Sequence, residues 1–84
     1  MTMKDVLNER FDDLGITKYE LTRRVLELRG QSSEPAEINK LQSAVAKALK
    51  EPDNRRYSAI VELVEAMGGE VVIRWKDYKE VKVP

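Results

Sequence analysis

Hydrophobic residues recur at helical spacing through residues 1–67, and at alternate positions through residues 70–83. Apolar side chains three or four residues apart share one face of a helix, whereas alternating ones share one face of a strand. Four stretches follow the helical repeat, and turn residues separate them. The pattern therefore predicts a mainly α fold, with four short helices followed by a short C-terminal β-strand or hairpin.

Polar residues mark the starts of the first two helices, and glycines mark their ends. The first helix is expected over residues 2–13, with Thr2 as its N-cap and Gly15 ending it in the left-handed conformation. The stretch 17–20 has the sequence of a capping box, in which the Thr17 hydroxyl accepts from the Glu20 amide and the Glu20 carboxylate accepts from the Thr17 amide. The second helix is expected to end near Arg29.

The predicted third helix, residues 38–50, has two different faces and follows the helix-starting Pro35. One face is apolar and suits a core. The other combines three lysines, an amide and a hydroxyl, with no carboxylate. Such a face suits nucleic acid, because ammonium groups meet phosphates and short polar groups reach base edges; the alternative is a merely solvated surface. The polar face consists of Asn39, Lys40, Ser43, Lys47 and Lys50.

The C-terminal part is expected to form a fourth helix over residues 55–67, ended by Gly68 and Gly69, and then strands. In the strand 70–75, one face would carry Val71, Ile73 and Trp75. A second, shorter strand would follow a turn at residues 76–79. An isolated hairpin is marginal in water, so this one must pack on the helices or pair with another chain.

The amino-acid composition limits the kinds of functional site that the chain can form. A chain of 84 residues, 42% hydrophobic and 36% charged, is expected to form a single globular domain, residues 1–84. Without Cys or His it offers no zinc-finger ligands and no Cys or His nucleophile–base pair, so we expect no metal, no cofactor and no enzymatic activity. No apolar run approaches the ~20 residues that cross a bilayer. We expect a cytoplasmic protein that does not act on membranes.

The charge is balanced overall but unevenly distributed. Fifteen basic and fifteen acidic residues give a formal net charge of zero, which counts against nucleic-acid binding. Residues 15–56, however, carry nine basic and six acidic side chains, a net charge of +3. The positive excess coincides with the polar face of the third helix.

Three stretches resemble the Cro/C1-type helix-turn-helix family, also called the XRE family. They are Leu14 to Leu21, Ala44 to Asn54 and Ile60 to Gly68. The strand after them is similar to the C-terminal strand of antitoxin-type members, which can pair across a homodimer. The chain departs from the family in the long segment from Leu26 to Pro35, where members have a tight turn, and in having Lys18 where many have Gln.

The resemblance implies a role for each matching residue. Asn39, Ser43 and Lys47 would contact base edges, while Lys40 and Lys50 would contact phosphates. Further phosphate contacts would come from Thr17 and Lys18 at the start of the second helix and from Arg55 and Arg56 at the start of the fourth. Val71, Ile73 and Trp75 would form the dimer interface.

The implied partners are double-stranded DNA, a second copy of the chain and, for an antitoxin, a cognate toxin protein. Trp75 and Tyr78 are candidate anchors for a protein partner, although Trp75 is equally suited to covering the core of its own chain. Sequence-specific DNA binding by a homodimeric transcriptional regulator is the expected function. The alternative is a protein-interaction module that keeps the fold without binding DNA.

Overall fold

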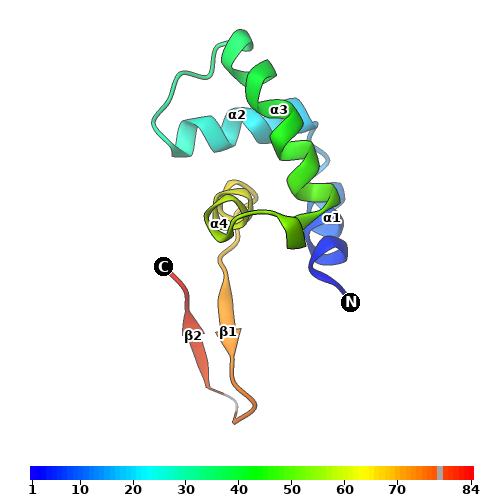
Figure 1. The fold of residues 1–84 in the computed structure, drawn as a ribbon, viewed down its shortest axis with the longest axis vertical. Helices are drawn as coiled ribbons and strands as arrows, with labels where there is room; N and C mark the ends of the chain where they lie inside the picture. Colours follow the sequence, from blue (N-terminus) through cyan, green and yellow to red (C-terminus); the bar gives the residue numbers. More distant parts are fainter. Residues whose placement is uncertain (78) are drawn as a thin grey trace.

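The computed structural model describes residues 1–77 and 79–84, and Figure 1 shows its elements. It confirms the predicted mainly α fold with a C-terminal hairpin. Every expected helix is present, with ends displaced by up to three residues from the prediction. In chain order the elements are α1 (Met3–Leu14), α2 (Lys18–Leu28), α3 (Pro35–Lys50), the 3-10 turn η1 (Pro52–Asn54), α4 (Tyr57–Ala66), β1 (Val72–Arg74) and β2 (Glu80–Lys82).

The helix ends follow the local sequence closely. Thr2 caps α1 in a complete capping box with Asp5, and Gly15 ends that helix with a left-handed φ of 64°. The predicted capping box of α2 is only half correct. The Thr17 hydroxyl accepts from the Glu20 amide, but the Glu20 carboxylate pairs with Arg23 and Arg24 on the next turn instead of reaching back.

The first three helices and α4 share one small core. Its buried members come from α1, α2, α3 and α4, and α2 packs against both α3 and α4. Leu21 of α2 is fully buried and Leu63 of α4 nearly so. Burial of each such side chain stabilises the fold by about 1.5–3 kcal/mol. The core residues are Leu7, Leu21, Val25, Val45, Ala48, Leu49, Leu63, Ala66 and Met67.

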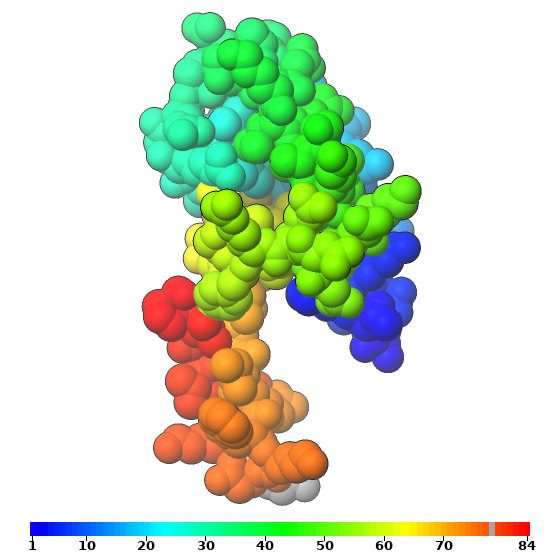
Figure 2. Space-filling view, in the orientation of Figure 1, coloured from blue at the N-terminus to red at the C-terminus, as the bar shows by residue number. Residues whose placement is uncertain are grey.

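The hairpin projects from the helices instead of packing on them (Figures 1 and 2). The molecule is consequently elongated, measuring 47 × 24 × 23 Å. β1 and β2 pair antiparallel within the chain, with Ile73 opposite Val81, and all six of their residues are exposed. Trp75 is 57% exposed, so the interpretation that it covers its own core is wrong.

The strands are shorter than the sequence predicted. The alternating pattern extended over residues 70–75, but the ladder in β1 covers only three residues. Tyr78, the other aromatic considered as an anchor, lies outside the described residues. In residues 1–77 and 79–84, none of the helices combines the length and apolarity needed to cross a membrane.

Candidate nucleic-acid interface

Four lysines from three helices surround one hollow on the surface. Lys4 comes from α1, Lys18 from α2, and Lys47 and Lys50 from α3. The hollow has a volume of about 310 Å³, and its other walls are Asn8, Ala46 and Leu49. We call it the lysine hollow. Residues 32 positions apart in sequence, such as Lys18 and Lys50, meet here only because the helices fold together.

Hydrogen bonds between side chains and backbone groups hold the helix ends that carry these lysines. The Asn8 side-chain amide donates to the Lys4 carbonyl and to the Leu49 carbonyl, both at 2.8 Å. The second bond joins α1 to the last turn of α3. On the remaining side, Thr17 caps the first turn of α2, and Lys18 is the first residue of that helix. All four lysines are thus carried on the end turns of helices.

The lysine hollow keeps its positive charge. Among the described residues, none of its four lysines forms an ion pair with a carboxylate. No acidic side chain of the part of the chain that the structure describes lines the lysine hollow. Four ammonium groups without counter-charges favour an anionic partner, and phosphate is the anion that nucleic acids present.

Nearby arginines, by contrast, are neutralised by carboxylates. Arg23 pairs with Glu20 and Glu27 along α2, and the hydrogen bond from Arg23 holds the pKa of Glu20 below its usual value. Arg29 forms a two-pronged pair with Glu62 of α4, and this hydrogen bond raises the pKa of Arg29. The Arg29–Glu62 pair joins the end of α2 to α4, whereas the Arg23 pairs lie within α2. Among the described residues, these arginines have carboxylate partners and the four lysines of the hollow do not.

The remaining polar residues of α3 continue from the lysine hollow toward the start of the helix. Asn39, Lys40 and Ser43 are exposed, and they share a face with Lys47 and Lys50. The Lys40 Nζ lies 3.6 Å from the Glu37 Oε1, and an exposed ion pair of this kind contributes little to the stability of the fold. The polar face of α3 is therefore continuous, with Asn39, Lys40 and Ser43 before the two lysines of its last turn.

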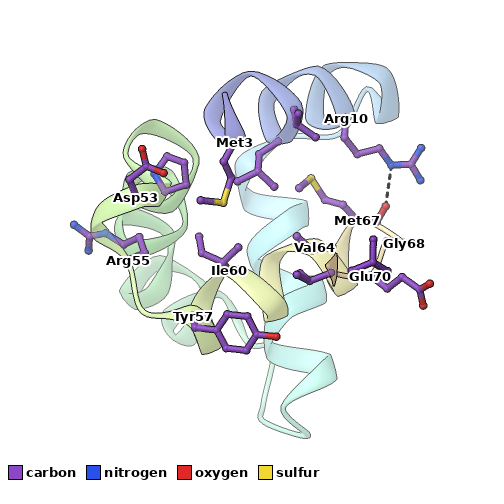
Figure 3. A pocket seen from close by; sticks show the side chains of 16 residues that line it. Met3, Arg10, Asp53, Arg55, Tyr57, Ile60, Val64, Met67, Gly68 and Glu70 are labelled. Carbon is purple, nitrogen blue, oxygen red and sulfur yellow. Dashed lines mark hydrogen bonds between the residues drawn. The ribbon is translucent and has the colours of Figure 1, made fainter. Parts of the chain in front are cut away.

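The structure does not bring Arg55 into the lysine hollow. Arg55 lines a larger apolar hollow of about 910 Å³ between α1, η1, α4 and the root of β1, which we call the α1–α4 groove (Figure 3). Its Nε is buried and has no hydrogen-bond partner among the described residues. Arg56 is exposed and precedes the first residue of α4.

Sequence reasoning missed Lys4 and Asn8. The first segment carries net negative charge, and this composition gives no indication that its single lysine joins a basic surface. A signal was nevertheless present, because Lys4 and Asn8 are four residues apart and therefore lie on one side of α1, beside the buried Leu7. Their proximity to α3 depends on tertiary packing.

Among the described residues, no three acidic side chains lie close enough together to hold a metal ion. Glu62 of α4 is engaged by Arg29. No protein-family model matches the chain, and neither does any curated protein or solved structure.

Proposed function

We propose that the protein binds double-stranded DNA sequence-specifically, as a homodimeric transcriptional regulator of the XRE helix-turn-helix type. The observation that carries the proposal is the lysine hollow at one end of the exposed polar face of α3. A cluster of free cations beside short polar side chains provides both kinds of contact that DNA recognition requires. Such a regulator would act in the cytoplasm.

The two halves of the face have different tasks in this proposal. Lys4, Lys18 and Lys50 contact phosphates and fix the orientation of the protein on the duplex. Asn39, Ser43 and Lys47 reach base edges in the major groove, where Asn pairs with adenine and Lys with guanine acceptors. α3 is then the recognition helix, and it is exposed along the whole of this face.

A homodimer would present two copies of α3. Two-fold symmetric helix-turn-helix proteins place their recognition helices in successive major grooves, roughly 34 Å apart. The exposed Ile73 and Trp75 of the hairpin, with the half-buried Val71 beside them, would supply a dimer surface. An antitoxin that also binds a toxin is one specific form of such a regulator.

The exposed hairpin and the α1–α4 groove also favour a second candidate, a protein-interaction module that does not bind DNA. The two candidates differ in their response to salt. DNA binding through several phosphates weakens steeply as the salt concentration rises, because counterions are released on binding. An apolar protein interface lacks that dependence.

The direct test is binding to the DNA upstream of the protein's own gene, compared with unrelated DNA of equal length. The Ser43→Ala, Lys47→Ala double variant is measured in parallel. We expect sequence-dependent binding by the natural chain and loss of that preference in the variant, with unchanged helical circular dichroism. Binding that ignores both sequence and variant would favour the interaction module.

A further inference from the structure

The hairpin leaves one row of backbone groups on β1 unpaired. The Trp75 amide donates to the Lys79 carbonyl at 2.8 Å, and the Val71 carbonyl accepts from the Val83 amide at 3.0 Å. Ile73 of β1 and the flanking Val71 and Trp75 therefore direct their backbone groups toward β2. Since alternate residues of a strand face opposite edges, the backbone groups of Val72 and Arg74 point to the open edge, where another strand can pair.

The α1–α4 groove begins where β1 leaves the helices. Its apolar walls come from α1 and α4, and residues 68–72 line its end (Figure 3). Its volume of about 910 Å³ falls within the range of about 300–1,000 Å³ typical of pockets that enclose organic ligands. Two of its apolar side chains, Val6 and Tyr57, are 51% and 52% exposed. The groove thus has room for an aromatic ring.

Two-fold pairing along the open edge would carry Trp75 of the partner subunit to this groove. Such a pairing is antiparallel, and it must join the backbone groups of Val72 and Arg74. If Val72 pairs with Arg74 of the partner subunit, the partner's Trp75 lies opposite Val71. If Val72 pairs with Val72 of the partner subunit, the partner's Trp75 lies opposite Gly69. Gly69 and Val71 both line the groove.

Charges favour these two registers. In the first, Glu70 lies opposite Lys76 of the partner subunit, and in the second it lies opposite the partner's Arg74, so no like charges face each other. Within one chain, Glu70 also pairs with Lys82, and Arg74 with Glu80. A third register would pair Arg74 with Arg74 of the partner subunit. Two like charges directly opposite each other destabilise a sheet.

We propose that the α1–α4 groove binds the indole of Trp75 from a second copy of the chain. This inference rests on the homodimer of the proposed function and specifies how it closes. Each groove receives one indole from the other subunit, and the four strands form one sheet in the order β2-β1-β1-β2. The pairing buries an otherwise exposed tryptophan, the residue type most enriched at binding hot spots.

The chain contains a single Trp, so its fluorescence reports directly on this site. The experiment follows Trp75 emission and acrylamide quenching across a dilution series, with sedimentation equilibrium recording the oligomeric state. The test variant is Val6→Glu, which puts a carboxylate into the groove from an exposed position. The matched control is Leu28→Glu, which changes an apolar side chain of similar exposure, 54%, at the end of α2. Circular dichroism checks that both variants fold.

In the natural chain we expect dimerisation to shift the emission to shorter wavelength and to lower the quenching constant at least twofold. Val6→Glu should weaken dimerisation by about tenfold or more and leave the indole open to quencher; Leu28→Glu should change neither. A dimer whose Trp75 is quenched as readily as in the monomer would overturn the inference alone. Shielding that survives Val6→Glu would also overturn it. A chain that stays monomeric would overturn both this inference and the proposed homodimer.

Discussion

The side-chain amide of Asn8 donates a hydrogen bond of 2.8 Å to the main-chain carbonyl of Leu49. This bond joins α1 to the last turn of α3, where backbone carbonyls have no partner within the helix. The same amide also donates to the carbonyl of Lys4. One short side chain therefore holds two walls of the lysine hollow at a fixed separation.

Replacing Asn8 with alanine should lower the free energy of unfolding by about 1–2 kcal/mol, because two hydrogen bonds are lost and a part-buried carbonyl loses its partner. Urea unfolding measures the change. Asn54→Ala is the matched control, since Asn54 is exposed and its side chain makes no hydrogen bond within the described residues; its effect should stay within about 0.5 kcal/mol. Equal effects of the two substitutions would contradict the role given to Asn8.

Substitutions at Gly15 test whether its left-handed conformation is what the turn after α1 requires. Its φ of 64° is left-handed, and a Cβ added there would meet no atom within 4 Å. Gly15→Ala should therefore cost about 1 kcal/mol through conformation alone. Gly15→Asn should cost less, because Asn tolerates the left-handed region better. Thermal unfolding of both variants distinguishes the two; equal losses would mean that something other than φ limits this position.

The lowered pKa values of Asp5 and Glu20 indicate that the fold loses stability in acid. The hydrogen bond from the Thr2 amide lowers the pKa of Asp5, and the hydrogen bond from Arg23 lowers the pKa of Glu20. A lowered folded-state pKa contributes stability that is present above the unfolded value of about 4 and is lost as the pH falls through the folded value.

The Asp5→Asn, Glu20→Gln double variant lacks this contribution at every pH. The free energy of unfolding should therefore differ between the natural chain and the variant at pH 7, and the difference should shrink as the pH falls toward 2. Urea titrations at a series of pH values provide the measurement. A gap that stays constant from pH 7 to pH 2 would show that these two carboxylates are not coupled to folding.

The sequence predicted the elements because their causes are local. Capping by Thr2, the left-handed Gly15 and the proline at the start of α3 each act within a few residues. The capping box predicted at Thr17 is only half correct, because the Glu20 carboxylate had three competing donors and the arginines on the next turn attracted it more strongly. Local patterns fix where helices start more reliably than they fix the direction of a long charged side chain.

The candidate interface was predicted less completely. Periodicity places Asn39, Ser43 and Lys47 on one face of α3, and the structure agrees. The part played by Lys4 and Asn8 depends on the packing of α1 against the end of α3, a contact between residues 41 positions apart. Arg55, expected beside the other cations, lines the α1–α4 groove instead, because η1 turns the chain before α4 begins.

The salt dependence of DNA binding shows whether the lysine hollow contacts phosphate groups. The logarithm of the binding constant is plotted against the logarithm of the salt concentration for the natural chain and for three variants. Two of them, Lys4→Ala and Lys18→Ala, each remove one lysine of the hollow. The control is Lys79→Ala, because Lys79 is exposed in the hairpin and forms no ion pair among the described residues. If the lysine hollow binds phosphate, each of its two variants lowers the slope by about one, and Lys79→Ala leaves it unchanged. Slopes that are the same for all four proteins would contradict the account.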